Sequence, residues 1–279
     1  MKQCVAALTC VVLLGCGRGG PEAPKPPEPP AAPAAPEAPR PPQAPPASEG
    51  TAAIVVPVGD DNRLNIPPAI YPPLPGRFAD AAAVTPGGWR IEYRVEGDLN
   101  GDRRADLVLV LRQQNPANIV NNDGLGGERL DTNPRLLVVG LAGQDGYRLA
   151  VANHSFIPRH LEPTLSDALE QSPAIRNGVL SITLNYFASA GGWTMSNATS
   201  RFRWQDGALR LIGHDYSEVQ RNTGETLDRS VNFLTRRVST TTSSIDADKD
   251  PAPVWTRLAD GPLLTIDQVG DGLEFNPVG

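Results

Sequence analysis

Turn dipeptides recur along the chain and constrain its fold more than any other feature. Asp145-Gly146, Asn177-Gly178 and Asp206-Gly207 each stand between segments in which apolar residues alternate with polar ones. Such dipeptides favour the tight turns of β-hairpins, because their residues tolerate positive φ angles at low cost. The pattern predicts a succession of short antiparallel strands.

The segments around these turns have the composition of strands. In residues 89–95 the alternation is expected to place Trp89, Ile91, Tyr93 and Val95 on one face of a strand. β-Branched and apolar residues predict further strands within residues 105–112, 134–153, 177–188, 200–215 and 230–244. Helical patterns are sparse. Leucines four residues apart make residues 161–172 the best helical candidate, and residues 77–85 could form one or two helical turns.

These elements predict a mainly β fold, an antiparallel sheet or sandwich-like meander of hairpins with little helix. With 279 residues, the chain has room for a single globular domain over residues 51–279. Residues 16–50 are dominated by proline, alanine and glutamate and hold almost no bulky apolar side chains. They are expected to form a disordered tether in extended polyproline II segments, acting as a spacer or as a PxxP ligand.

The cysteines of the chain are confined to its beginning, at Cys4, Cys10 and Cys16. The remainder therefore has no disulfide, thiolate metal site or cysteine nucleophile. Lys2 and the apolar run that follows it have the form of a secretory signal peptide over residues 1–15, too short to span a bilayer.

The end of that run, Leu13-Leu14-Gly15-Cys16, resembles the lipobox of bacterial lipoproteins. The resemblance implies cleavage before Cys16 and acylation of that cysteine, which would anchor the protein in a membrane. Gly17, in place of an aspartate, implies the outer membrane by the sorting rules of enterobacteria, with the domain facing the periplasm or the cell surface. The alternative is an ordinary secretory signal with chance cysteines.

An acidic loop precedes the apolar run 107–111. Asp98, Asn100, Asp102 and Asp106 offer side-chain oxygens at alternating or near-alternating positions, and Arg104 offers its backbone carbonyl. Calcium is bound by six to eight such oxygens, so the spacing predicts a structural Ca²⁺ site.

The same residues resemble a single calcium loop of the FG-GAP and VCBS type, which carries aspartates at this spacing before an apolar strand. Where that pattern has glycine, this chain has Arg103, which is strained if the position requires positive φ. The alternative interpretation is a hydrogen-bonded turn without metal, in which Arg103 and Arg104 neutralise the aspartates.

Two irregular stretches are candidate functional segments. Residues 113–134 run without periodicity, as functional or disordered loops do. Trp193 follows a glycine pair and is expected either to contact a ligand or to pack as a rim aromatic.

The sequence narrows the function to two classes. A net charge of −6 argues against nucleic acid as a partner. Standard catalytic motifs are absent from the sequence, and His214-Asp215 is interpreted as an exposed pair at a strand end. A tethered binding or interaction module is therefore favoured, with cell wall, polysaccharide or another envelope protein as its partner. The alternative is an envelope hydrolase acting on glycan or peptide.

Residues 187–215 and 223–235 also resemble stretches of uncharacterised bacterial envelope proteins, a likeness that implies no activity.

Overall fold

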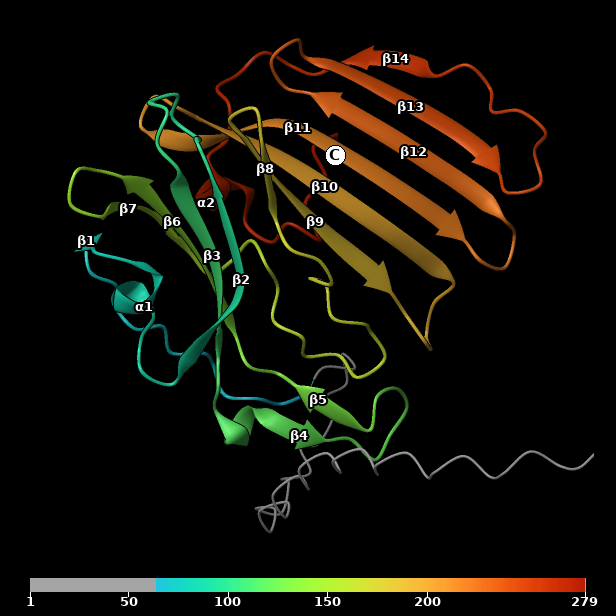
Figure 1. Ribbon diagram of the computed structural model, residues 1–279. Helices are drawn as coiled ribbons and strands as arrows, with labels where there is room; N and C mark the ends of the chain where they lie inside the picture. The colour runs from blue at the N-terminus through green and yellow to red at the C-terminus, as the bar shows by residue number, and fades with distance from the viewer. Residues whose placement is uncertain (1–63, 279) are drawn as a thin grey trace, which may run out of the picture. The chain divides into compact units, whose positions relative to one another are not determined.

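The first of two large antiparallel sheets lies on the left in Figure 1, a computed structural model that describes residues 64–278. Its strand order is β1-β7-β6-β3-β2. The strands are β1 (Arg77–Phe78), β2 (Trp89–Gly97), β3 (Asp106–Gln113), β6 (Arg135–Ala142) and β7 (Tyr147–Asn153). The predicted signal peptide, Cys16, the tether and residues 51–63 lie outside the described residues.

The second sheet is a seven-stranded antiparallel meander that runs from β8 to β14 in chain order. Its strands are β8 (Ala174–Arg176), β9 (Val179–Phe187), β10 (Thr194–Gln205), β11 (Ala208–Gln220), β12 (Glu225–Asn232), β13 (Arg237–Ser244) and β14 (Val254–Arg257). The expectation of a mainly β, antiparallel fold with little helix is confirmed.

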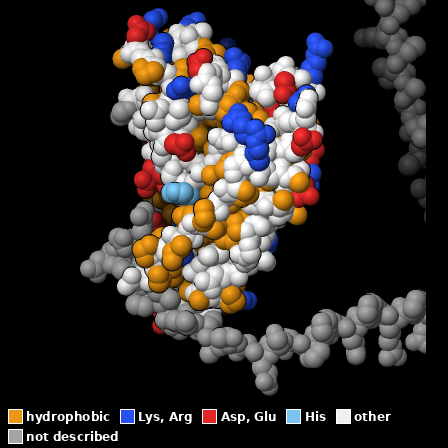
Figure 2. Space-filling view, turned by 90° about the vertical axis from the view of Figure 1, so that its left-hand side faces the viewer, with side chains coloured by type: hydrophobic (Ala, Val, Ile, Leu, Met, Phe, Trp, Pro, Cys, Tyr) orange, Lys and Arg blue, Asp and Glu red, His pale blue; other side chains and the backbone are white. Residues whose placement is uncertain are grey.

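Short elements complete the described part of the chain. The hairpin of β4 (Ile119–Asn121) and β5 (Arg129–Asp131) follows a 3₁₀ turn at Pro116–Asn118. The helices α1 (Ala81–Val84) and α2 (Ile266–Val269) are single turns, each with a side-chain N-cap. None of the helices in the described residues is both long and apolar enough to cross a membrane. On the side of β1 and α1, hydrophobic side chains form a band between charged ones (Figure 2).

The strand β3 contributes to two cores, which explains its uninterrupted apolar sequence. Val108 and Val110 point between the two sheets and pack with residues such as Leu180, Ile182 and Phe202 of the second sheet. The alternate side chains of β3 face the other way, beneath α1 and the residues that precede it, and these are Leu107, Leu109 and Leu111. A strand buried on both faces has no need for polar alternation.

The predicted turns connect strands as expected. Asn177 and Gly178 join β8 to β9, and Asp206 and Gly207 join β10 to β11, with positive φ at all four residues. That geometry is the one in which the backbone twist of the turn matches that of the strands. Asp145-Gly146 joins β6 to β7, with positive φ at Gly146 alone.

The single apolar face predicted for residues 89–95 is wrong. The register between β2 and β3 shifts between Ile91 and Tyr93, so that Glu92 is the extra residue of a β-bulge. A bulge breaks the period of two. Trp89 therefore packs beneath α1, whereas Tyr93 and Val95 pack between the sheets.

The helix predicted for residues 161–172 is also wrong, because this segment extends an edge of the second sheet. Leu165 forms a bridge with Ala188, Ser166 N–H donates to Phe187 O at 3.0 Å, and Ala168 O accepts from Asn185 N–H at 2.8 Å. Pro163 removes a backbone donor near the start of the segment, and pairing with β9 replaces the hydrogen bonds that a helix would make.

One other expectation about elements needs correction, and the aperiodic stretch 113–134 is ordered. The single strand predicted for residues 230–244 is a hairpin of β12 and β13, whose turn has positive φ at Arg236. The aperiodic stretch 113–134 contains β4 and β5, and its residues Val120 and Leu130 are buried with Leu64 in a small core of their own. This segment is ordered although its sequence is aperiodic, because these few buried apolar side chains are enough to anchor it.

Candidate functional site

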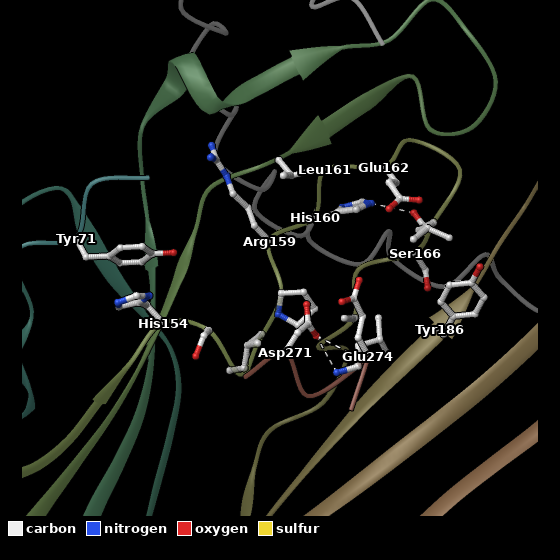
Figure 3. A pocket seen from close by; sticks show the side chains of 16 residues that line it. Tyr71, His154, Arg159, His160, Leu161, Glu162, Ser166, Tyr186, Asp271 and Glu274 are labelled. Atoms are coloured by element: carbon white, nitrogen blue, oxygen red, sulfur yellow. Dashed lines mark hydrogen bonds between the residues drawn. The ribbon is translucent and has the colours of Figure 1, made fainter. Parts of the chain in front are cut away.

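A cavity of about 510 Å³, which we call the inner cleft, lies between the segment 154–168, the end of β9 and the C-terminal residues 271–274. Its volume falls within the usual range for small-molecule sites. Apolar and polar side chains share its lining (Figure 3). The polar and charged ones are Tyr71, His154, Ser155, Arg159, His160, Glu162, Ser166, Tyr186, Asp271 and Glu274.

The segment that forms one wall leaves β7 at Asn153. The Asn153 side-chain oxygen accepts from the N–H groups of Ser155 and Phe156 at 3.2 and 2.9 Å, and its amide donates to Asp267 at 2.7 Å. Phe156 is buried and meets the Phe202 ring edge-on, with 5.3 Å between the centroids. These contacts fix the turn after β7, and they therefore fix the position of the segment that forms this wall of the cavity.

The two histidines of this wall are held by different contacts. The His154 ring stacks on Tyr71, with 4.4 Å between centroids and 16° between planes. Burial raises the pKa of the Tyr71 hydroxyl, which therefore stays protonated at neutral pH. His160 Nε2 lies 2.8 Å from the carbonyl oxygen of Leu165 and donates to it, since a carbonyl oxygen can only accept.

Arg159 ties the rim of the cavity to the β4–β5 region. Its guanidinium donates to the carbonyl oxygen of Thr132, to that of Pro67 at 2.8 Å and to Asn118 Oδ1 at 3.2 Å. Figure 3 shows this side chain pointing away from the centre of the hollow. The Arg159 guanidinium therefore stabilises the rim of the cavity and does not face its interior.

Three carboxylates approach the interior from two segments. Figure 3 shows Asp271 and Glu274 on one side of the hollow, with Glu162, Ser166 and Tyr186 toward the other. Asp271 accepts from the N–H of Leu273 at 2.8 Å, which fixes the turn that carries Glu274. The interior therefore offers hydrogen-bond acceptors from the carboxylates and hydroxyls that can donate or accept.

A second hollow of about 260 Å³ adjoins the first, because Leu273 and Glu274 line both. His214 lies at its base and is buried, so the interpretation of His214 as an exposed residue at a strand end is wrong. Its Nδ1 is 3.0 Å from Ser200 Oγ, and burial lowers the pKa of His214 to about 4. Asp215 points to the opposite face, where it pairs with Arg201, so Asp215 does not orient this histidine.

The predicted calcium loop connects β2 to β3, and its side-chain oxygens accept hydrogen bonds from backbone N–H groups. The Asp98 carboxylate accepts from Gly101 and Arg103 at 2.7 and 2.8 Å, and Asp102 accepts from Arg104 at 2.8 Å. These bonds, that from Arg103 above all, lower the pKa of Asp98. The Asn100 side-chain oxygen likewise accepts from the Asp102 N–H at 2.9 Å.

Asp106 closes the loop from a fully buried position. Its two oxygens accept from the N–H groups of Leu99 and Ala142, each at 2.8 Å, and burial raises its pKa. Arg103 has a φ of +67°, so the strain expected of arginine in place of glycine is present. Within residues 64–278 neither Arg103 nor Arg104 forms an ion pair with these aspartates, and no three acidic, histidine or cysteine side chains are grouped as a metal site would require. The N–H bonds still leave lone pairs on the carboxylate oxygens, so the donor set remains chemically suited to Ca²⁺.

Trp193 lies in the β9–β10 turn with 61% of its surface exposed. Arg221 holds this turn by donating to the carbonyl oxygens of Gly192 and Trp193, at 2.9 and 3.2 Å. Its guanidinium also lies 4.6 Å from the Phe187 ring centroid and 5.9 Å from that of Trp193. Trp193 thus belongs to none of the buried clusters of the described residues, and Arg221 holds its turn by hydrogen bonds and a cation–π contact.

Sequence reasoning missed the cavity because its residues come from segments that are far apart in the chain. His154 and His160 were visible as two of only three histidines, but no spacing linked them to Glu274. No protein-family model matches the chain, and no curated protein or solved structure is significantly similar to it.

Proposed function

We propose that this protein is a lipid-anchored component of a bacterial outer membrane, acylated at Cys16, whose β domain is a binding module. The observation that carries the binding role is the 510 Å³ cavity between the 154–168 segment and the C-terminal residues. Its wall is fixed by internal hydrogen bonds, and its interior is lined by carboxylates, hydroxyls and tyrosine rings. Such a lining favours a polar ligand of the cell envelope that carries hydroxyl, amide or amino groups.

Calcium belongs to this proposal as a structural ion. Asp98, Asn100, Asp102 and Asp106, with the carbonyl of Arg104, would hold it at the entrance to β3. The ion would neutralise carboxylates that repel one another and would stabilise the loop that leads into both cores.

Calorimetric titration with soluble disaccharide-peptide fragments of peptidoglycan tests the cleft. We expect measurable heat with the full-length protein and at least about tenfold weaker binding in Glu274→Gln, which removes one charged acceptor. Glu225→Gln, an exposed change at the start of β12, is the matched control and should bind as the wild type does. Absence of heat, or equal binding by Glu274→Gln, would reject the cleft as the site for such ligands.

A hydrolase is the second candidate, and one observation favours it: carboxylates from two separate segments, Glu162 and Glu274, line the same hollow. Glycosidases use two such groups on either side of the scissile bond. Incubation of the same fragments with the wild type and Glu274→Gln, followed by mass spectrometry, separates the two functions. A binding module returns the fragments intact, whereas a hydrolase yields products that the variant does not form.

A further inference from the structure

The outward face of the seven-stranded sheet is a regular array of small polar side chains. Ala198, Ser200 and Phe202 of β10 are buried, so the alternation along the strand turns Asn197 and Thr199 to the other side. Directly paired residues of antiparallel neighbours share a face. The register therefore aligns one row across five strands, consisting of Asn185, Asn197, Ser217, Asp228 and Thr241.

The adjacent row has the same character. It consists of Thr183, Thr199, Asp215, Ser230, Ser239 and, on the edge strand β14, Trp255. Within this row the Thr183 and Thr199 hydroxyls are 2.8 Å apart, and the Ser230 hydroxyl donates to Asp215 at 2.7 Å. Side chains this short leave the sheet surface open to a flat ligand.

Two adjoining hollows lie over these rows. One of about 310 Å³ lies over β9 to β11, and another of about 300 Å³ lies over β10 to β13. Both are lined by Asn197 and Ser217, and we call the pair, which crosses the strands from β9 to β13, the trough. Neighbouring strands lie about 4.8 Å apart, so the four steps from β9 to β13 give the trough a length of roughly 19 Å.

One end of the trough is apolar. Phe187, Met195 and Val219 are aligned there by the sheet register, and Phe187 and Met195 are 39% and 42% exposed. Trp193 stands beside this end on the turn that Arg221 holds. An exposed aromatic ring that is already fixed can stack on a ligand at little further cost in entropy.

The chemistry of the trough suits a hydroxyl-rich, uncharged chain. Sugar rings present C–H faces that stack on aromatic rings and rims of hydroxyls that bond to amides and hydroxyls. Asp215 is paired with Arg201 at 2.5 Å. The other charged residues that line the two hollows are the acidic Glu170 and Asp228 and the basic Arg229, so acidic groups outnumber basic ones and disfavour a polyanion.

We propose that this trough binds a neutral polysaccharide, with Asn197 and Ser217 as central hydrogen-bonding residues and Trp193 as a stacking residue at one end. The inference extends the binding-module proposal to a second site. Ser166 and Tyr186, at the edge of the sheet, line both the inner cleft and the apolar end of the trough, whereas Asn197 and Ser217 line the trough alone.

Native affinity electrophoresis of the full-length protein tests this site. The gels contain laminarin, hydroxyethylcellulose, dextran or galactomannan, with alginate as the polyanion. We expect retardation by at least one neutral polysaccharide and none by alginate. The double variant Asn197→Ala/Ser217→Ala and the single variant Trp193→Ala should each weaken the association about tenfold, as the loss of one or two hydrogen bonds or one stacked ring predicts.

Two control variants make the result specific. Ser181→Ala changes the same face outside the trough, and Glu225→Gln changes an exposed residue at the start of β12; both should be retarded as the wild type is. Melting temperatures of all variants establish that they are folded. Failure of every neutral polysaccharide to retard the protein, equal retardation by alginate, or undiminished retardation of the trough variants would overturn the inference. Since the cleft is tested by calorimetry with a different variant, failure at one site leaves the other result intact.

Discussion

His214 shows how burial sets the behaviour of a single residue. The ring is 1% exposed and bonds to Ser200, and burial lowers its pKa from 6.5 to about 4. The unfolded chain therefore binds the proton first as the pH falls. Stability is lost as the pH falls from about 6.5 towards 4, by up to about 3 kcal/mol, since each pKa unit corresponds to about 1.4 kcal/mol.

Urea unfolding between pH 7.5 and 4.5 measures this effect. His214→Asn keeps a polar group near Ser200 without the titration, so its stability should change less with pH than that of the wild type. Ser166→Ala, a change in the wall of the cleft that leaves every titratable group in place, should retain the wild-type slope. Identical slopes for the wild type and His214→Asn would contradict the prediction.

At the scale of elements, a buried ion-pair cluster ties the wall of the cleft to the first sheet. Arg135 on β6 bonds to Glu92 at 2.6 Å and to Asp167 at 2.6 Å, and Arg112 on β3 reaches Glu92 at 3.0 Å. The Arg135 side chain is 3% exposed and that of Glu92 is 11% exposed. The bulge in β2 is what brings Glu92 to this position.

Removal of the Glu92 charge should therefore be costly. Glu92→Gln leaves two buried arginines with one carboxylate fewer, and we expect a loss of about 3 kcal/mol of unfolding free energy in urea. Glu96→Gln on the same strand breaks an exposed pair with Arg94 and should cost less than about 1 kcal/mol. Equal losses in the two variants would show that the cluster adds nothing to stability.

The cluster also has a defined pH response. Its arginines lower the pKa of Asp167, although burial alone would raise it. The stabilisation by Asp167 is therefore complete above its ordinary pKa of 3.8 and is lost as the pH falls through the lower folded-state value.

The loop between β2 and β3 is the element that we expect to respond to calcium. An ion that binds the folded state alone stabilises it by about 2.7 kcal/mol at 100 times its Kd, so Ca²⁺ at that excess should raise the melting temperature by several degrees relative to EDTA. Asp102→Ala should abolish the shift. Asp248→Ala, in an exposed loop that also alternates carboxylates, should preserve it. An unchanged wild-type melting temperature would favour the turn without metal.

At the scale of the whole molecule, the proposed anchor decides where the domain acts. Cys16→Ser should move the protein from washed membranes to the soluble fraction, because the acyl chains that hold it would be absent. Cys10→Ser is the control and should remain in the membrane fraction. Mass spectrometry of the wild type should show an acylated cysteine at the new N-terminus, and a soluble wild-type protein would reject the anchor.

The local sequence determined the fold class and several turns of this protein. Turn dipeptides act within four residues, and the pleat imposes a period of two along each strand, so both are readable without tertiary information. The oxygen spacing in the 98–106 loop is likewise local, as is the positive φ that Arg103 adopts. The single apolar face predicted for residues 89–95 was wrong because Glu92 is one extra residue that breaks the period of two. Such a bulge is stabilised by partners distant in sequence, here Arg135.

Only the tertiary structure decided which residues share a site. The segment 161–172 has the leucine spacing of a helix, yet pairing with the edge of β9 outweighed a weak helical propensity. The same pairing brought Ser166 and Tyr186 to a cavity with Glu274, a residue more than a hundred positions from Ser166. The trough arose from the register of five strands, which aligned Asn185, Asn197, Ser217, Asp228 and Thr241. Register is fixed by the packing of the buried face, so the order of residues along one strand does not contain it.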